Sequence, residues 1–169
     1  ASQNREDALT SAFYEESRKY FEDRYEGIDW TWHPEFDHET RKNEMGELFT
    51  EIGLLQPQMT AMELAYKITR NEFFITIAAL AVSIYTNKND IMLSWIYNGR
   101  EDVQNLSTIR LLFRDLPVGV RLRDNETLRE LFADVHDQVQ RGIEHSCYPY
   151  VEKNGQNLTN ETVYLLYQQ

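Results

Sequence analysis

Cysteine is almost absent from this chain of 169 residues, because Cys147 is the single one. A protein with one cysteine cannot build an internal disulfide framework, so the sequence fits a reducing compartment such as the cytoplasm. Basic residues are also scarce: 17 Lys and Arg stand against 28 Asp and Glu, which gives a formal net charge of −11. Phosphate backbones and anionic lipid surfaces repel such a chain, so nucleic acid and membranes are poor partners for it.

The most apolar stretch of the chain is short. It runs from Phe73 to Tyr85, is interrupted only by Thr76 and Ser83, and falls below the roughly 20 residues needed to cross a bilayer. A helix that is apolar on every side has to be buried on every side, so this stretch is predicted to be the central helix of the core. Asn71 is predicted to be its N-cap.

Motifs for nucleophilic, phosphate-binding or redox chemistry are missing: the sequence holds no G-x-S-x-G, no Gly-rich phosphate loop and no C-x-x-C. The segment His33 to His38 contains Pro34 and lacks the helical spacing of a zinc motif, so a solvated linker is preferred over a metal site. His145 and Cys147 are too close in sequence for a typical nucleophile–base pair, since the fold brings such partners together. From the residues alone we predict no catalytic group and no metal ligand.

The sequence does contain a regular succession of helices and strands. Thr127 and Glu130 have the spacing of a capping box, which marks the clearest helix start. Pro117 lacks a backbone donor and is expected at the start or the edge of its strand. The expected elements are helices at Arg5–Tyr25, Met59–Arg70, Phe73–Tyr85 and Thr127–His145, and strands at Met45–Leu55 (ended by Pro57), Ile91–Tyr97, Leu116–Leu122 and Thr162–Tyr167.

This succession predicts a mixed α/β fold class, in which helices cover a mixed β-sheet. A length of 169 residues fits one domain or one lobe of a larger one. Within it, residues 1–44 are expected to form a leading helix and a linker, and residues 45–169 the folded lobe.

Five segments, in a fixed order, resemble the motifs of one family. Phe13–Tyr25 is similar to a helix of the type EE-x-R-x-YW-x-ER, and Asn71–Asp90 to a buried helix that ends in a Y-T-G-x-x-D turn. Tyr97–Arg100 resembles a strand end of the type NGR, Ile109–Val120 the motif I-G-x-F-x-N-T-L-P-x-R, and His145–Tyr150 the motif H-Q-D-Y-P-F. The chain thus resembles the condensation domains of nonribosomal peptide synthetases, whose fold is that of the chloramphenicol-acetyltransferase-like acyltransferases.

The departures from the family pattern concern the catalytic motif above all. The sequence has no His-His and no Asp-Gly pair, so the motif H-H-x-x-x-D-G of the family's N-terminal lobe has no counterpart. In the fourth motif the family's Gly is Arg110, its Asn-Thr is Arg114–Asp115, and its Arg is Gly119. The resemblance therefore implies most of a C-terminal lobe, cut from a larger megasynthase and inactive on its own.

In the family, an amine on one carrier protein attacks a thioester on another, and both substrates hang on phosphopantetheine arms that enter a tunnel between two lobes. The resemblance implies carrier-protein domains and the missing N-terminal lobe as partners, and a role in the biosynthesis of antibiotics or other secondary metabolites. It implies no cofactor bound directly. The missing lobe would leave an exposed apolar face, through which the chain could form a homodimer.

Motif positions alone place six residues near the tunnel. A structural role is the alternative for each: Arg100 and Asp115 could pair, and Tyr148 could pack on Pro149. Two other functions stay open, namely an epimerisation domain, which inverts a carrier-bound amino acid on the same scaffold, and a non-catalytic module that docks carrier proteins. The predicted tunnel residues are Tyr97, Asn98, Arg100, Arg114, Asp115 and Tyr148.

Overall fold

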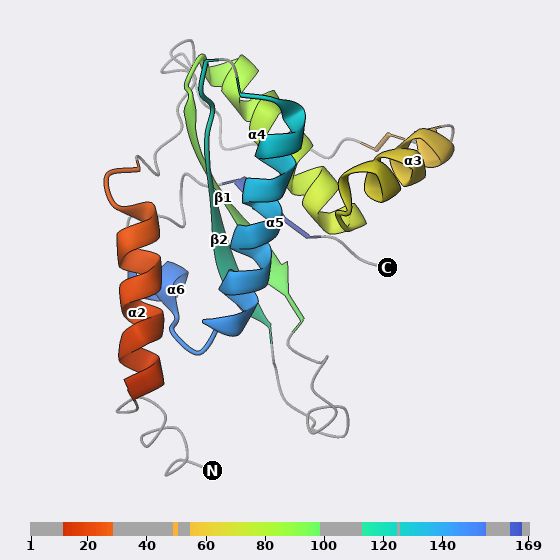
Figure 1. Cartoon of the computed structure of the whole chain (residues 1–169). Coiled ribbons are helices and arrows are strands. Elements are labelled where there is room, and N and C mark those ends of the chain that lie inside the picture. The colour runs from red at the N-terminus through yellow and green to blue at the C-terminus, as the bar shows by residue number, and fades with distance from the viewer. Residues whose placement is uncertain are drawn as a thin grey trace, which may run out of the picture.

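The fold packs helices on a small β-sheet (Figure 1). The computed structural model describes residues 12–28, 49–50, 55–98, 113–124, 126–154 and 163–166. The strands of these ranges form one sheet in the order β2-β1-β3, with β2 antiparallel and β3 parallel to β1. The mixed α/β class is therefore confirmed. In chain order the elements are α2 (Ala12–Tyr25), α3 (Gln56–Tyr66), α4 (Arg70–Thr86), β1 (Asp90–Tyr97), β2 (Arg114–Arg121), α5 (Leu128–Glu144), α6 (Tyr150–Asn154) and β3 (Val163–Leu165).

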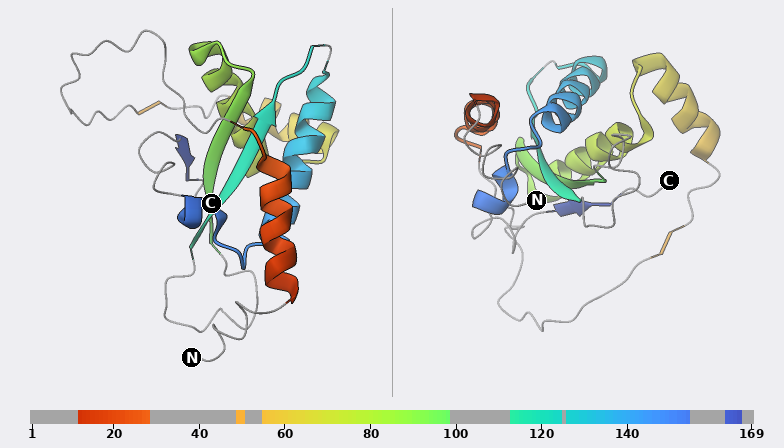
Figure 2. Two further views of the ribbon diagram at one scale, coloured as in Figure 1. Left: turned by 90° about the vertical axis from the view of Figure 1, so that its left-hand side faces the viewer. Right: turned by 90° about the horizontal axis from the view of Figure 1, so that it is seen from below.

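The main hydrophobic core lies between the sheet and helices α4 and α5, which cover the same face (Figure 2). Successive side chains of a strand point to opposite faces, so every second residue of β1 and β2 enters this core. The buried members are Ile91, Leu93 and Trp95 of β1, Leu116, Val118 and Val120 of β2, Ile75 and Ala79 of α4, and Leu131, Val135 and Val139 of α5.

The N-cap of helix α4 lies two residues earlier than predicted. Its N-cap is Thr69 and not Asn71, because the Thr69 hydroxyl accepts from the N–H of Glu72 while the Glu72 carboxylate accepts from the N–H of Thr69 at 2.8 Å. Glu72 is fully buried, and its Oε1 lies 3.1 Å from Nδ1 of His136 and accepts from Nε2 of Gln140 at 3.2 Å. This first turn therefore fastens α4 to α5.

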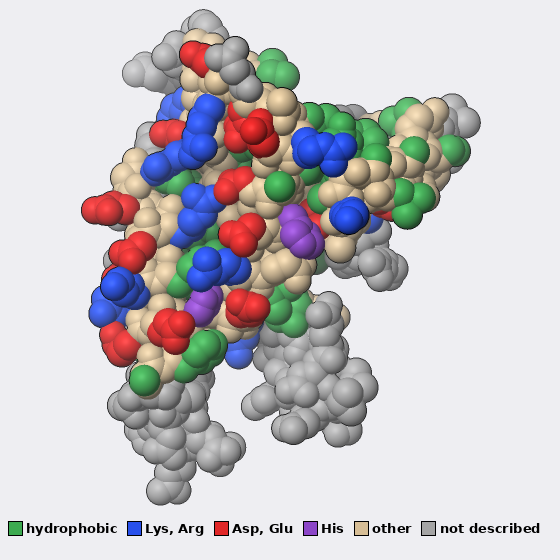
Figure 3. Space-filling view, viewed as in Figure 1, with side chains coloured by type: hydrophobic (Ala, Val, Ile, Leu, Met, Phe, Trp, Pro, Cys, Tyr) green, Lys and Arg blue, Asp and Glu red, His purple; other side chains and the backbone are tan. Residues whose placement is uncertain are grey.

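Helix α4 is buried on one side only, so the prediction of burial on every side is wrong. Ala79 is fully buried, whereas Ile77 is 39% and Ile84 83% exposed. Leu64 of α3 is exposed as well, and hydrophobic side chains gather over α3 and the adjoining part of α4 (Figure 3). Helix α4 therefore carries more apolar side chains than the sheet and α5 bury.

Helix α3 starts where the sequence predicts the end of a strand. Pro57 lies in its first turn, where the missing N–H would have no helical partner. The predicted strand Met45–Leu55 lies mostly outside the described residues. The helix ends at Lys67, which is left-handed (φ 56°), so the predicted helix Met59–Arg70 is too long at its end.

Among the described residues no single helix is long and apolar enough to span a bilayer, and α3 and α4, which together would be, meet at a bend of 100°.

Helix α5 begins with the predicted capping box. The Thr127 hydroxyl accepts from the N–H of Glu130, and the Glu130 carboxylate accepts from the N–H of Thr127 at 2.8 Å. Donation to the Glu130 carboxylate by the backbone N–H and the hydroxyl of Thr127 lowers the pKa of Glu130. The predicted helix is therefore confirmed, with its caps at Thr127 and His145.

Strand β2 is an edge strand of the described sheet. Side chains from other elements form hydrogen bonds with backbone groups on its outer edge. Pro117 lies here, as its missing N–H predicts. Gln138 of α5 replaces a neighbouring strand: its Nε2 donates to the carbonyl of Gly119 and its Oε1 accepts from the Gly119 N–H, both at 2.9 Å. The Tyr25 hydroxyl donates to the carbonyl of Pro117 at 2.9 Å, and burial raises the pKa of Tyr25 well above its ordinary value, which keeps the proton in place. The edge is thus closed to further pairing.

A second cluster, rich in aromatic residues, lies at the β2 edge, where α2 and α6 meet the other face of the sheet. The rings of Phe21 and Tyr150 stack with 5.5 Å between centroids, and Phe21 is fully buried. The first predicted helix is confirmed over its described part, and it is held by this cluster. The buried members are Tyr14, Phe21, Tyr25, Ile28, Met92, Tyr148 and Tyr150.

Candidate functional site

Four of the six predicted tunnel residues meet at one end of the β1–β2 pair. The strands are antiparallel, with Tyr97 opposite Arg114 and Ile96 opposite Asp115. Asn98 follows directly after β1 and is exposed. The register therefore unites residues from two separate family motifs, which the sequence alone could not place side by side.

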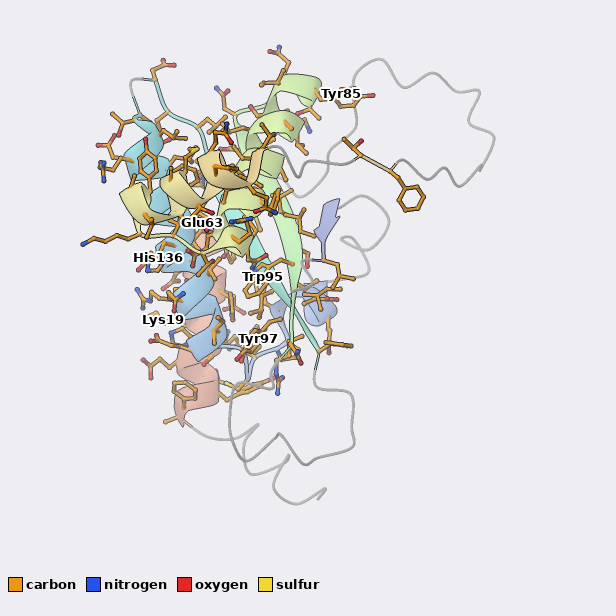
Figure 4. The ribbon with its side chains drawn as sticks, turned by 90° about the vertical axis from the view of Figure 1, so that its right-hand side faces the viewer. Lys19, Glu63, Tyr85, Trp95, Tyr97 and His136 are labelled. Carbon is orange, nitrogen blue, oxygen red and sulfur yellow. The ribbon has the colours of Figure 1, made fainter. Side chains whose placement is uncertain are left out.

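The sheet divides this group between its two faces. Cross-strand partners point to the same face, and neighbours along a strand point to opposite faces. Tyr97 and Arg114 lie on the face covered by α4 and α5, and Tyr97 packs against the main core there. Figure 4 shows Trp95 and Tyr97 on this side of β1, where their rings meet edge-on with centroids 5.9 Å apart. Arg114 is exposed, and the described residues give its guanidinium no ion-pair partner.

Asp115 lies on the opposite face, toward α6. Burial raises the pKa of its carboxyl group, and the negative charge of Glu152 on α6 raises it further. The folded protein therefore binds this proton more tightly than the unfolded chain does, so the ionised carboxylate lowers stability at neutral pH.

We expect Asp115→Asn to raise the thermal midpoint of the chain at pH 7. The gain should shrink as the pH falls and vanish below the ordinary pKa of aspartate, because the carboxyl is then neutral in both states. Asp137→Asn, on the exposed side of α5, is the matched control and should show no such gain. Equal midpoints of wild type and Asp115→Asn at pH 7 would contradict the unfavourable burial of this charge.

The other two predicted residues do not join the group at the strand end. Tyr148 is 5% exposed and belongs to the aromatic cluster, where it meets Tyr14 edge-on with centroids 5.3 Å apart. Its surroundings here are those of a packing residue. Arg100 lies outside the described residues, as does the segment His33 to His38.

The structure brings together one constellation that the sequence does not predict. Ser17 of α2 lies between His145 and Cys147: its Oγ is 3.0 Å from Nδ1 of His145, and the Cys147 thiol donates to it at 3.3 Å. The His145 ring is buried and lies between the rings of Phe13 and Tyr20, at 5.7 and 4.5 Å. These contacts fasten α2 to the end of α5. Nothing in the sequence links Ser17 to a histidine 128 residues away.

A polar hollow of about 340 Å³ opens at the far end of β2, away from the predicted tunnel residues. Two of its arginines have partners: Arg24 pairs with Asp134 at 2.6 Å, and Arg121 donates to the backbone carbonyl of Glu26 at 2.8 Å. In the part of the chain that the structure describes, no three His, Cys, Asp or Glu side chains could hold a metal ion. The hollow is lined by Arg24, Gly119, Arg121, Arg123, Asp124, Glu126, Glu130 and Asp134.

Comparison with known proteins identifies one domain family. The condensation-domain family matches residues 2–162. The first condensation domain of the CDA synthetase superposes with a TM-score of 0.77 at 13% identity, covering 99% of this chain and 38% of that one. The X-domain from teicoplanin biosynthesis gives 0.74 at 18% identity over 96% and 38%, and the SgcC5 protein from Streptomyces globisporus gives 0.73 at 14% over 95% and 36%. No curated protein matches the sequence.

The structural likeness and the family match carry different information. At identities below 20%, superposition shows the fold, which is that of condensation domains. The chain spans about 38% of the length of these structures. Because the family match covers nearly the whole sequence and the fold agrees with it, the chain belongs to the condensation-domain family.

Proposed function

We propose that the chain forms the C-terminal lobe of a condensation domain that joins a carrier-bound aminoacyl or peptidyl thioester to a carrier-bound amine. One observation carries the proposal: Tyr97, Asn98 and Arg114, which come from two family motifs, meet at the same end of β1 and β2. The motif H-H-x-x-x-D-G is not in this sequence, so we expect the chain alone to make no amide. Its part is to supply one wall of the substrate tunnel.

Such a wall acts by holding the two substrates. Placing an amine and a thioester in reacting geometry removes a large share of the barrier, because little orientational freedom is left to lose. Phosphopantetheine arms on partner carriers supply the thioester, and this chain's residues bind and orient it. The exposed guanidinium of Arg114 is a fork of donors for carbonyl or phosphate oxygens, and the Tyr97 ring beside it offers an apolar surface.

In the intact parent domain, we expect Arg114→Ala to lower the rate of amide formation about tenfold or more. A hydrogen bond to a charged group contributes roughly 1.5–3 kcal/mol, and each 1.4 kcal/mol is a factor of ten in rate. Arg100→Ala, in the adjoining motif, should lower the rate in the same way. Product is measured by mass spectrometry with both carriers loaded.

The matched control is Arg121→Ala at the other end of the same strand, which should leave product formation unchanged. Thermal melts of each variant separate lost function from lost folding. Arg114 is not part of the tunnel wall if its variant melts and turns over like wild type.

A docking module is the second candidate, and the altered fourth motif favours it. Arg114, Asp115 and Gly119 all differ from the family pattern, and all three lie on β2. Among the structural neighbours, the X-domain from teicoplanin biosynthesis is seen in complex with OxyB. A parent domain that binds loaded carriers yet forms no amide would support this candidate, whereas exchange of the Cα proton in heavy water would support an epimerisation domain.

A further inference from the structure

Trp95 carries a buried hydrogen-bond donor on its indole ring. Its side chain is 6% exposed, and the described residues offer its Nε1–H no acceptor. In the described part of the chain, the hydroxyl groups of Tyr20 and Ser94 are likewise buried without a hydrogen-bond partner. A hydroxyl can rotate toward a new partner and can also accept, whereas an indole N–H is a fixed donor that can only donate. The unmet donor of Trp95 is therefore the most specific of the three.

This donor lies beside the candidate functional site. Trp95 sits on the central strand, opposite Leu116 of β2 and Leu165 of β3. It shares a face with Tyr97 and Arg114, and two residues along a strand span roughly 6.6 Å. The indole is thus one step inward from the end where the predicted tunnel residues meet (Figure 4).

The surroundings define what could bind there. A donor left unpaired in a dry site is unfavourable, so an acceptor that reaches it gains affinity from the hydrogen bond. The neighbouring side chains are aromatic or aliphatic, namely Tyr97, Leu116 and Leu165. These apolar surroundings disfavour binding of a charged acceptor and allow binding of a neutral one, because a buried ion without a partner is strongly unfavourable. A carbonyl oxygen on a slim chain meets both conditions.

We propose that Trp95 is a specificity-determining residue, whose indole N–H binds a carbonyl oxygen of the pantetheine-linked substrate. The proposal rests on the proposed function, because that function brings such a chain to this end of the sheet. In this proposal Tyr97 and Leu165, which are only partly buried, move to uncover the donor. Amide carbonyls of the arm and the thioester carbonyl have the same chemistry, and the experiment separates them.

The test observes the Trp95 indole proton directly in the 169-residue chain. The protein is labelled with ¹⁵N on its three tryptophans, and Trp95→Phe identifies the Trp95 signal. Pantetheine, which has amide carbonyls only, and S-acetylpantetheine, which adds a thioester, are titrated separately. We expect the Trp95 signal to move downfield and saturate. A shift with both probes shows that an amide carbonyl accepts the Trp95 hydrogen bond. A shift with S-acetylpantetheine alone shows that the thioester carbonyl accepts it.

Trp95→Phe keeps an aromatic ring but removes the donor together with part of the ring system, and the lost hydrogen bond should weaken probe binding about two- to tenfold. An unmoved Trp95 signal, equal affinity of the variant, or absence of probe binding would each overturn the proposal. A lasting contact between this proton and water in the free protein would overturn it too, since a structural water would then satisfy the donor. The amide-forming assay of the parent domain is independent of all these outcomes, so the two failures can be told apart.

Discussion

Ala79→Asp is expected to abolish cooperative folding of the chain. Ala79 has no exposed surface and packs in the main core between α4 and the sheet. A lone carboxylate there has no partner, and its desolvation costs several kcal/mol even when the group becomes neutral. A domain of this size has a total stability of about 5–15 kcal/mol, so this single change consumes most of it.

The measurement is urea unfolding followed by far-UV circular dichroism. Ala81→Asp is the matched control, because Ala81 lies two residues further on the same helix and is exposed. The two variants carry the same charge and the same loss of helix propensity, so burial is their main difference. A cooperative transition of Ala79→Asp close to that of Ala81→Asp would show that α4 is not seated on the sheet at this point.

The sequence predicted the elements of this fold well wherever local signals decide them. The capping box at Thr127 and Glu130 and the edge position of Pro117 follow from side-chain chemistry within a few residues. Asn71 failed as an N-cap because Thr69, two residues earlier, forms the reciprocal pair with Glu72. Both residues are competent caps, and the neighbouring packing of Glu72 against α5 selects between them.

The arrangement of the candidate site depends on register, which no local signal specifies. Motif positions named Asp115 and Arg114 together, but adjacent strand residues point to opposite faces. The pairing of Tyr97 with Arg114 joins residues that are far apart in the sequence, and so does the contact of Ser17 with His145. Trp95 was not predicted at all, because an unsatisfied donor can be recognised only when its surroundings are known.

Gly119 shows how this chain accommodates its departure from the family. The motif that this segment resembles has an arginine at this position, yet a Cβ atom here would lie 2.7 Å from Sδ of Met92 and 2.8 Å from Cδ1 of Ile28. Cδ1 of Tyr25 would be 3.0 Å away, and these three neighbours are themselves buried. The second cluster therefore occupies the space of the missing side chain. The end of α2 reaches the β2 edge because residue 119 is glycine.

We expect Gly119→Ala to lower the free energy of unfolding by about 1–3 kcal/mol, the usual cost of overpacking a core. Gly119→Arg, which restores the family residue, should prevent folding, because it adds a larger clash and an unpaired buried charge. Gly142→Ala is the matched control: its Cβ would meet nothing within 4 Å, and it lies inside α5, so it should add about 0.5–1 kcal/mol. Opposite signs for the two alanine variants in urea unfolding are the expected result. If Gly119→Arg instead unfolds at the wild-type midpoint, α2 does not pack on β2 through Tyr25, and the cluster does not fill the place of the family's arginine.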